Sequence, residues 1–423
     1  MTEKYVVQAS HMEAWNLQQW LEHLGHIHPT EIELGLERVA QVYAELNRDT
    51  SGCKVITVAG TNGKGTTCAM LEQAILIAGK SVAVYSSPHL LDYRERVRVN
   101  GQMLSEKLHC KAFLQVELAR KDISLTYFEF ATLAALQLMF DAQVDYLVLE
   151  VGLGGRLDAV NIIDPDIAVI TSIDLDHQDW LGDNREDIAR EKAGIFRAGI
   201  PAVIGEVDPP KSLIEEAHRF QLETYWQNQD FTFSQDEQRF NWQNKTKQYQ
   251  SLPLPKIPGQ NASTALQVIS LIGLDLTQED VHQLLLRTQL PGRRQFVQTK
   301  PSVMLDVAHN PQATRLLLEE INKLEYATLY FVVAMLGDKD IEQSLSPLQQ
   351  LNAHWLVAPL DVPRGAKADQ LISVLDKGQK VLEFPNIETA YENALLNANL
   401  QDLIVVFGSF FTVAEVLSLI EKR

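Results

Sequence analysis

The sequence predicts an α/β protein with two domains, a first domain built on a mainly parallel sheet and a second, smaller α/β domain. Short continuous apolar runs alternate with segments of helical periodicity, which is typical of strands that helices cover on both faces. The chain has 423 residues, more than one hydrophobic core usually organises, so domains of roughly 100–300 residues are expected. Hydrophobic residues make up 46% of the chain and charged residues 22%, which indicates an ordinary globular protein.

The first domain is expected to open with helix and then to alternate strand with helix. Residues 12–47 carry apolar side chains at helical spacing, and Asn100-Gly101 is a hairpin signal. Residues 219–250, where aromatic and polar side chains alternate, predict a small antiparallel insert. Predicted strands lie at residues 55–59, 82–85, 146–151, 167–173 and 202–204, with predicted helices at 66–78 and 128–140.

A second, smaller α/β domain is predicted beyond residues 290–301, where a Pro-Gly-Arg turn precedes a polar stretch. We therefore divide the chain into residues 1–294 and residues 295–423. A crevice between two α/β domains is a usual place for a ligand site. Strands of the second domain are expected at residues 303–307, 329–333, 355–358 and 403–407.

Composition and charge exclude several classes of protein. The net charge is −18, whereas proteins that bind nucleic acid usually carry a basic face. No apolar run reaches the roughly 18 residues that cross a membrane, and the N-terminus lacks the apolar core of a signal peptide. Cys53, Cys68 and Cys110 form no CxxC pair, and their odd number argues against a disulfide framework. We expect a cytoplasmic protein with free thiols that binds neither nucleic acid nor membrane.

The strongest functional signal is the sequence VITVAGTNGKGTT at residues 55–67. An apolar strand, a glycine-rich turn with Lys64 and a helix follow one another there. The backbone N–H groups of such a turn, the positive end of the helix dipole and the lysine together bind phosphate oxygens. Only two residues separate Gly60 from Gly63, unlike the common G-x-x-x-x-G-K-[ST] motif. The turn predicts a nucleotide phosphate site, but a generic kinase or GTPase is disfavoured.

A carboxylate and a histidine follow two further predicted strands. Glu150 ends the strand in LEVGLGGRLDAVN, and His177 lies beyond the strand in ITSIDLDHQDWLG. Because the carboxyl ends of parallel strands meet at one edge of a sheet, both should reach the edge that carries Lys64. A carboxylate there suits Mg²⁺, which prefers oxygen ligands. In the turn after Glu150, Arg156 and Asp158 either belong to the site or pair with each other.

The residues around Lys192 do not by themselves indicate a function for it. Lys192 lies in the predicted helix of REDIAREKAGIFR, beside two small residues. A solvated helical position is the commonest use of lysine. On this basis Lys192 is expected at the surface.

Together these segments resemble the folylpolyglutamate synthase/dihydrofolate synthase family within the Mur-ligase superfamily. The matching segments, in order over essentially the whole chain, are AGTNGKGT, YSSPHL, TYFE, EVGLGGRLDAVN, LDH, EKAGIF, PGR, DVAHNP and GSFFTV. The resemblance implies an N-terminal P-loop ATPase domain with a mainly parallel sheet and a smaller C-terminal Rossmann-like α/β domain. It implies a cytoplasmic, monomeric ligase that uses ATP and Mg²⁺ to join L-glutamate to dihydropteroate and to reduced folates through an acyl phosphate.

The same resemblance implies roles for individual residues. ATP contacts are implied at Gly60, Thr61, Asn62, Gly63, Lys64, Gly65, Thr66, Asn261, Arg293 and Asp306. Two Mg²⁺ ions are implied at Ser87, Glu150, His177 and Lys192, the last as a carbamate. The pterin side is implied at Glu33, Leu34, Gly35, Thr126, Tyr127, Phe128, Glu129, Leu157, Asp158 and Ala159, and the glutamate end at His309 and Ser409. The implied catalytic residues are Lys64, Lys192 and His177.

Alternatives to a bifunctional ligase remain open. A monofunctional folylpolyglutamate synthase shares most of the framework, and a Mur-type ligase for a cell-wall precursor shares the phosphate loop. The TYFE and GLERV segments favour a folate substrate. A regulatory P-loop NTPase would hydrolyse ATP without pterin or glutamate. An inactive binding protein is disfavoured by the intact set of Lys64, Glu150, His177 and Lys192.

Overall fold

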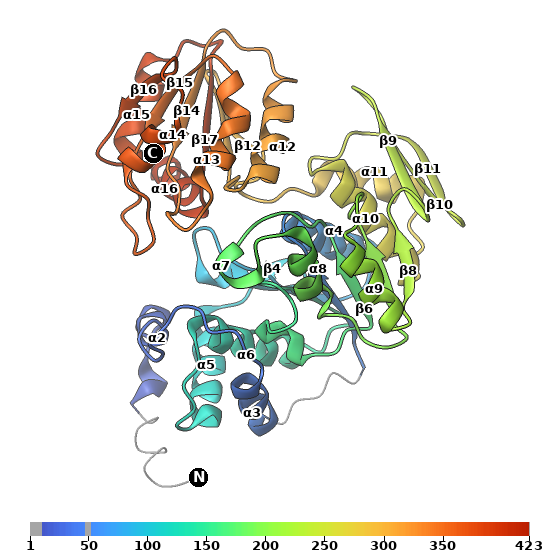
Figure 1. Ribbon diagram of the computed structural model, residues 1–423. Helices are drawn as coiled ribbons and strands as arrows, with labels where there is room; N and C mark the ends of the chain where they lie inside the picture. Colours follow the sequence, from blue (N-terminus) through green and yellow to red (C-terminus); the bar gives the residue numbers. More distant parts are fainter. Residues whose placement is uncertain (1–10, 47–51, 423) are drawn as a thin grey trace. The chain divides into compact units, whose positions relative to one another are not determined.

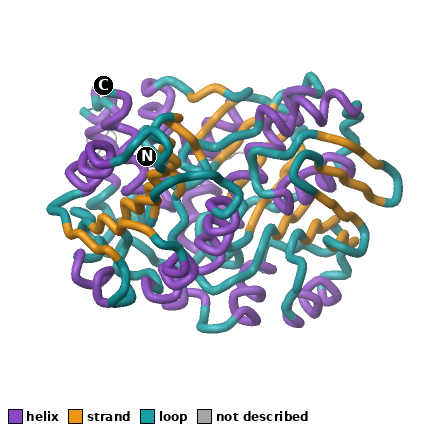
Figure 2. Tube along the Cα trace, turned by 90° about the horizontal axis from the view of Figure 1, so that it is seen from above, coloured by secondary structure: helices purple, strands orange, loops and turns teal. Residues whose placement is uncertain are grey.

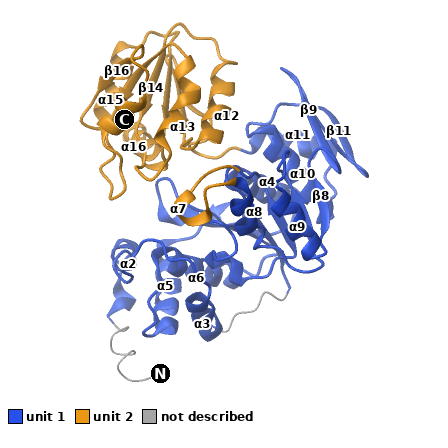
Figure 3. Cartoon of the chain, viewed as in Figure 1, with its two compact units in different colours: residues 1–173, 185–288 blue, residues 174–184, 289–423 orange. Residues whose placement is uncertain are grey.

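The computed structural model describes residues 11–46 and 52–422 (Figure 1). Helices and strands alternate along most of the trace (Figure 2). The chain divides into two compact units, unit 1 within residues 1–173 and 185–288 and unit 2 in residues 174–184 and 289–423 (Figure 3). The short segment 174–184 belongs to unit 2 although the chain on both sides of it belongs to unit 1. The alternation of helices and strands confirms the predicted α/β class.

An eight-stranded sheet forms the centre of unit 1, in the order β4-β3-β2-β5-β1-β6-β7-β8. Neighbours from β2 to β8 pair in parallel, and β3 and β4 add an antiparallel hairpin at one edge. The strands are β1 (Lys54–Ala59), β2 (Val82–Tyr85), β3 (Val97–Val99), β4 (Gln102–Met103), β5 (Tyr146–Glu150), β6 (Ile167–Ile170), β7 (Pro201–Ile204) and β8 (Glu223–Trp226).

Helices cover both faces of this sheet, because successive strand side chains point to opposite sides. Ile56 of β1 packs in one hydrophobic cluster with Leu71 of α4, whereas Val55 packs in another with Phe113 of α5. Burying such a side chain stabilises the fold by about 1.5–3 kcal/mol. The helical segments of unit 1 are η1 (Met12–Ala14), α2 (Leu17–Leu24), α3 (Glu37–Leu46), α4 (Lys64–Ile77), η2 (Tyr93–Arg96), α5 (Glu106–Arg120), α6 (Tyr127–Asp141), η3 (Ala159–Ile162), α8 (Arg185–Ala193), α9 (Lys211–Arg219), α10 (Gly259–Leu271) and α11 (Gln278–Arg287).

The predicted antiparallel insert is a three-stranded sheet of β9 (Phe231–Gln235), β10 (Phe240–Asn244) and β11 (Gln248–Leu252). Trp242 is buried in the same hydrophobic cluster as α4, and its indole N–H donates to the carbonyl of Ser263 at 3.1 Å. The insert begins later than expected, because β8 pairs with β7 in the large sheet.

Unit 2 has a six-stranded sheet in the order β12-β13-β17-β14-β15-β16, parallel except for β12. Its strands are β12 (Gln295–Thr299), β13 (Ser302–Asp306), β14 (Leu329–Val333), β15 (Ala353–Val357), β16 (Lys380–Glu383) and β17 (Leu403–Phe407). Its helical segments are α7 (Gln178–Leu181), α12 (Pro311–Ile321), α13 (Ile341–Leu345), η4 (Ser346–Gln350), α14 (Ala368–Val374), α15 (Ile387–Asn397) and α16 (Phe410–Glu421).

Three local predictions were wrong in extent. Residues 12–47 are not one helical run. The helix α2 ends at Leu24, before Gly25 and before Pro29, which cannot continue a helix interior. Asn47, the last residue of the predicted helical region, lies outside the described residues. The polar residues 295–299, for which no strand was predicted, form the edge strand β12. The strand predicted at 167–173 ends at Ile170. Among the described residues no helix is long and apolar enough to cross a membrane, and the three cysteines are free thiols.

Candidate active site

The glycine-rich turn between β1 and α4 adopts a backbone that side chains would block. Gly60 has φ +152°, and a Cβ on it would lie 1.8 Å from Oγ1 of Thr171. Gly63 has φ +89°, and a Cβ on it would lie 2.5 Å from Oδ1 of Asn261. Both positions therefore require glycine. The helix α4 begins directly after Gly63, at Lys64, as the phosphate-site prediction needs.

Residues after β6 fix this turn in place. The Thr171 hydroxyl donates to the carbonyl of Asn62 at 2.7 Å, and the N–H of Thr61 donates to the carbonyl of Ser172 at 2.7 Å. The N–H of Asn62 also donates to the Ser172 hydroxyl at 3.1 Å. These bonds come from the two residues that directly follow β6, so the shape of the turn is held by the protein itself.

The polar side chains of the turn converge on the start of α4. Nζ of Lys64 donates to the carbonyls of Gly60 at 2.9 Å and Thr61 at 3.2 Å. Nδ2 of Asn261, from α10, donates to the Thr66 hydroxyl at 2.8 Å. An ammonium group beside a helix N-terminus is suited to phosphate oxygens. The structure thus brings Lys64, Thr66 and Asn261 together.

Glu150 and Ser87 meet at the carboxyl ends of two adjacent strands, β5 and β2. The Glu150 side chain is buried, and its Oε2 accepts a hydrogen bond from the Ser87 N–H at 3.3 Å. In residues 11–46 and 52–422, no group of three or more His, Cys, Asp or Glu side chains is arranged to hold a metal ion. A metal site here therefore needs another oxygen donor, and the Ser87 hydroxyl can supply it.

The glycine-rich turn after β5 packs on the end of α8, which carries Lys192. The N–H of Arg156 donates to the carbonyl of Glu191 at 2.8 Å, and a Cβ on Gly194 would lie 2.3 Å from Cα of Arg156. Lys192 is 3% exposed, so the expected solvated position is wrong. The possible Arg156–Asp158 pair is also wrong, because Nη2 of Arg156 binds Oε1 of Glu191 at 2.7 Å.

Asp158 instead organises the turn through the backbone. Its carboxylate accepts hydrogen bonds from the N–H groups of Leu153 at 2.8 Å and Val160 at 2.9 Å. Burial raises the pKa of Asp158 to about 6, against the opposing effect of these bonds. Leu157 is half-buried beside it and Ala159 is buried. The three residues lie together, with the Asp158 carboxylate used to shape the turn.

The two segments assigned to the pterin side are joined by a residue that the sequence did not single out. Arg38 of α3 pairs with Glu33, and its Nη2 is 2.9 Å from Oε1 of Glu129. Nε2 of His28 is 2.8 Å from Oε2 of Glu33. Glu129 closes the capping box of α6 with Thr126. Arg38 belongs to the GLERV segment, but nothing in the sequence indicates which carboxylates it pairs with.

An aromatic ring at the start of α6 links the second of these segments to the turn after β5. The Phe128 ring lies 6.2 Å from the Tyr85 ring, and a Cβ on Gly152 would lie 2.4 Å from Cζ of Phe128. The buried guanidinium of Arg96 is 5.5 Å from the Tyr127 ring centroid. Leu34 and Gly35 are half-buried near the start of α3. All the unit 1 residues assigned to the pterin side are thus ordered around α3, α6 and the β5 turn.

In unit 2, Asp306 is the last residue of β13, and Arg293 lies in the turn before β12. Asp306 accepts hydrogen bonds from the N–H groups of Arg294 at 2.9 Å and Ala308 at 2.8 Å, and burial raises its pKa. The guanidinium of Arg293 lies 4.7 Å from the Phe410 ring centroid. A positively charged, planar group held in this way can bind phosphate.

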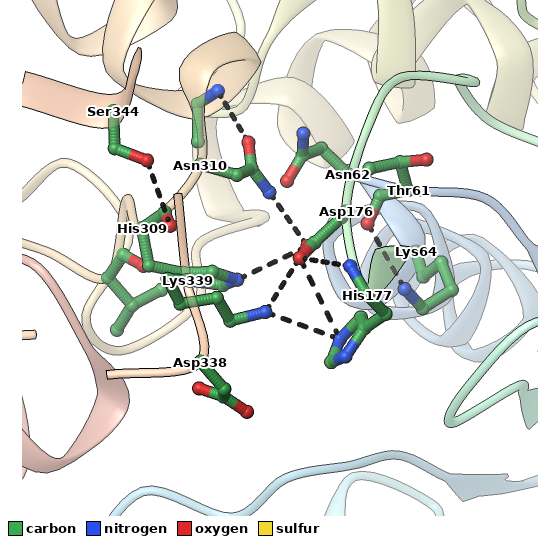
Figure 4. Close-up of polar contacts among 12 residues, drawn as sticks. Thr61, Asn62, Lys64, Asp176, His177, His309, Asn310, Asp338, Lys339 and Ser344 are labelled. Atoms are coloured by element: carbon green, nitrogen blue, oxygen red, sulfur yellow. Dashed lines mark hydrogen bonds and ion pairs between the residues drawn. The ribbon is translucent and has the colours of Figure 1, made fainter. Parts of the chain in front are cut away.

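A second polar cluster of unit 2 surrounds Asp176 (Figure 4). Oδ1 of Asp176 is 2.6 Å from Nζ of Lys339, and both side chains are less than 10% exposed. Oδ2 accepts a hydrogen bond from Nδ2 of Asn310 at 3.0 Å and lies 3.6 Å from Nε2 of His309. Burial alone would raise the pKa of Asp176, but the bond to His309 and the charge of Lys339 hold it well below its ordinary value.

His177, His309 and Ser409 differ in what their side chains contact. Nε2 of His177 is 3.4 Å from Nζ of Lys339. His309 faces Asp176 and holds the carbonyl of Val307 through Nδ1 at 2.7 Å. The Ser409 hydroxyl caps α16 by accepting from the Thr412 N–H at 3.0 Å, which gives it a structural function. The sequence analysis missed Lys339, although it follows the buried strand β14 in the polar segment GDKD.

Comparison with known protein families gives two matches along the chain. The Mur ligase middle domain matches residues 58–272, and the glutamate ligase domain of Mur ligases matches residues 292–410. The first covers the phosphate loop, Glu150 and Lys192. The second covers Arg293, Asp306 and Lys339.

Individual proteins and solved structures agree with these families. The chain is 45% identical over 408 residues to the dihydrofolate synthase/folylpolyglutamate synthase of Escherichia coli (strain K12), covering 96% of each chain. The structure of E. coli FolC in complex with DHPP and ADP matches with a TM-score of 0.94 at 44% identity, over 97% of this chain and 99% of that one. A bifunctional folylpolyglutamate synthase/dihydrofolate synthase with Mn, AMPPNP and L-glutamate bound matches with a TM-score of 0.91 at 49% identity, over 97% and 99%.

Proposed function

Since the chain belongs to the dihydrofolate synthase/folylpolyglutamate synthase family of Mur ligases, we propose that it is an ADP-forming ligase that adds L-glutamate both to dihydropteroate and to reduced folates. The observation that carries this proposal is the preformed phosphate loop, in which Lys64 and Thr66 lie at the start of α4. ATP is the co-substrate. Relatives solved with ADP or AMPPNP support a nucleotide here.

The first step activates a poor electrophile. A carboxylate oxygen of the folate substrate attacks the γ-phosphorus of ATP, the bond from that phosphorus to ADP breaks, and an acyl phosphate forms. The turn at residues 60–66 holds the phosphates through its N–H groups, and Lys64 neutralises the charge that develops on the transferring group. Asn261, Arg293 and Asp306 complete the ATP contacts, with Arg293 as a further phosphate ligand.

The second step forms the amide. The amine of glutamate, once it has lost a proton to solvent, attacks the acyl carbon, and the carbon–oxygen bond to phosphate breaks. The nitrogen releases a second proton to solvent as the amide forms. Inorganic phosphate leaves with one oxygen of the original carboxylate. His309 is our candidate for binding the glutamate end, since its ring is fixed between Val307 and Asp176. Ser409 contributes at this end by holding the start of α16.

The residues present fit a divalent metal. We propose that this metal is Mg²⁺ and that two ions bind. The buried Glu150 carboxylate beside Ser87 gives oxygen donors at the strand ends. His177 is proposed as a further ligand on the family resemblance alone. Mg²⁺, when bound, neutralises the charge of the β- and γ-phosphates. Lys192 is proposed as a carbamate, since a buried amine is more readily deprotonated and a carbamate would add two oxygens.

The carbamate has its own test. Protein equilibrated with ¹³C-bicarbonate should give a carbamate carbon signal in NMR spectra that Lys192→Arg lacks. A signal of equal intensity in the variant would remove Lys192 from the role. Partial rescue of an inactive Lys192→Ala enzyme by a short-chain acid would support it.

We further propose that residues 1–294 are the ATP-binding domain, which also holds the pterin, and that residues 295–423 are the glutamate-ligase domain, which adds Asp306 to the ATP contacts. The two Mur ligase family matches support this division. The pterin would lie among Glu33, Leu34, Gly35, Thr126, Tyr127, Phe128, Glu129, Leu157, Asp158 and Ala159. We propose a cytoplasmic monomer, which size-exclusion chromatography would test.

The runner-up is a folylpolyglutamate synthase without the first activity. Purified protein is to be assayed with ATP, Mg²⁺ and glutamate, with dihydropteroate in one reaction and tetrahydrofolate in the other, and products are identified by mass spectrometry. A glutamate adduct of both substrates is expected. Product from tetrahydrofolate alone would establish the monofunctional alternative, and ATP hydrolysis without either product would reject a ligase.

A further inference from the structure

The proposed reaction gives no role to Asp176, although its carboxylate contacts several side chains of unit 2 (Figure 4). It lies within bonding distance of Lys339 and Asn310 and close to His309, and its side chain is 9% exposed. A buried carboxylate without partners would be strongly unfavourable, so these contacts must persist for the group to remain charged. Asp176 therefore connects three parts of unit 2: its own segment, Lys339, and the neighbouring residues His309 and Asn310.

The same carboxylate fixes the residue that follows it. The N–H of His177 donates to Oδ1 of Asp176 at 2.9 Å, and Nε2 of His177 is 3.4 Å from Nζ of Lys339. His177 has φ +51°, a left-handed conformation that residues with side chains adopt rarely. The orientation of the imidazole therefore depends on the Asp176–Lys339 pair on one side and on this backbone on the other.

Segment 174–184 is shaped like a loop with joined ends. Nε of Arg185 donates to the carbonyl of Ile173 at 3.0 Å, which closes the loop at its base within unit 1. Within unit 2, Asp174 pairs with Arg315 at 2.7 Å, but these side chains are 21% and 54% exposed. Exposed ion pairs contribute little to stability, whereas removing one partner of a buried ion pair strongly destabilises the structure. The buried contacts of Asp176 are thus the strongest polar anchor of the segment, beside the buried side chain of Leu181.

We propose that Asp176 is a positioning residue of the ligase: through Lys339, Asn310 and His309 it fixes segment 174–184, and with it His177, to the body of unit 2. This inference rests on the proposed function and on the role of His177 in it. Replacing the carboxylate leaves the Lys339 ammonium buried beside the His177 imidazole, and the imidazole loses its orientation. Residues that orient a functional histidine typically change activity about 10–100-fold when they are removed.

The test begins with Asp176→Asn, which keeps the shape of the side chain and removes its charge. We expect kcat to fall by about 10–100-fold with both folate substrates, while the KM for ATP and the thermal unfolding of the protein stay close to those of the wild type. Hydrogen exchange of residues 174–184, measured without nucleotide or metal, should become faster. Asp176→Glu, which restores a carboxylate, should recover part of the rate.

A double-mutant cycle with Lys339→Met tests whether the two charges act as a pair. The double variant should be no slower than the slower single variant, because each change alone already breaks the pair. Asp174→Asn is the matched control on the same segment, and it should turn over at the wild-type rate. Additive losses in the cycle would contradict the inference.

The outcomes separate this inference from the proposed function. An inactive wild-type protein in the same assay would overturn the proposed function itself. An active wild type with an equally active Asp176→Asn, or with unchanged hydrogen exchange in that variant, would overturn the positioning role alone. Should Asp176→Asn not fold, Lys339→Met carries the test, and a wild-type rate there would overturn the inference.

Discussion

The phosphate loop of unit 1 and the Asp176 cluster of unit 2 are built in opposite ways. The loop is held by backbone groups and hydroxyls, and even Lys64 donates to main-chain carbonyls. The cluster is held by one buried carboxylate that gathers charged and polar side chains from distant segments. A backbone-built site tolerates changes in surrounding side chains, whereas a site built on one charge fails when that charge is removed.

Lys64→Ala is the change with the largest expected effect, and it tests whether the backbone alone makes the loop functional. The loop should keep its shape, since its glycines and the Thr171 bond remain. We expect kcat to fall by roughly 10²–10³-fold, because the group that neutralises transferring charge is lost. Lys80→Ala, an exposed lysine just beyond α4, is the control. A near wild-type rate for Lys64→Ala at saturating ATP would contradict the assignment.

Glu150→Gln sharpens the comparison, because it removes a single charge at the edge of the backbone-built region. The neutral amide keeps one oxygen beside Ser87 but loses the attraction for a divalent cation. The metal concentration needed for half-maximal activity should rise at least about tenfold. The titration is run with Mg²⁺ and with Mn²⁺, and binding of Mn²⁺ is followed separately by electron paramagnetic resonance. An unchanged Mn²⁺ affinity would exclude Glu150 as a ligand.

Arg38→Met tests the charged part of unit 1 that most resembles the Asp176 cluster. Arg38 joins Glu33 and Glu129, and a charge-assisted hydrogen bond contributes about 1.5–3 kcal/mol. We expect the KM for dihydropteroate to rise about tenfold, with the KM for ATP unchanged. Lys121→Met, which breaks the exposed pair with Glu45, serves as the control. Equal rises in both KM values would point to a general loss of fold instead.

The smallest expected effect concerns stability and pH. Burial lowers the pKa of His109 to about 4 from 6.5. Between these values the unfolded chain binds a proton that the folded chain does not, so stability falls as pH falls through this range. His109→Phe should therefore lose about 2 kcal/mol less free energy of unfolding than the wild type between pH 7 and pH 5. Denaturant unfolding at the two pH values measures this, and equal losses would contradict it.

The same contrast explains what the sequence could predict. The phosphate loop was predicted because its glycines, lysine and flanking elements are contiguous. Glu150 was placed correctly because a parallel strand carries its last residue to the sheet edge. The exposure of Lys192 was misjudged from its neighbouring residues, since its burial comes from packing against the turn at Arg156. Lys339 and Arg38 were missed, because their partners are far away in the sequence.

Fold prediction failed at similar places. The buried strands of both sheets were found from their apolar runs, whereas the edge strands β12 and β16 have exposed, polar or mixed residues. The run predicted at residues 167–173 extended beyond β6, because Thr171 and Ser172 are buried and bond to the end of β1 and to the phosphate loop, outside the strand itself. Periodicity reports burial, and it cannot show where strand pairing ends.

The measurement that most directly tests the central claim follows the carboxylate oxygens. Dihydropteroate labelled with ¹⁸O in both carboxylate oxygens is converted with ATP and unlabelled glutamate, and the inorganic phosphate is analysed by mass spectrometry. If the carboxylate is activated as an acyl phosphate, each molecule of amide formed should release one phosphate that carries one ¹⁸O. Unlabelled phosphate alongside full amide formation would contradict phosphoryl transfer to the carboxylate and, with it, the chemistry assigned to Lys64.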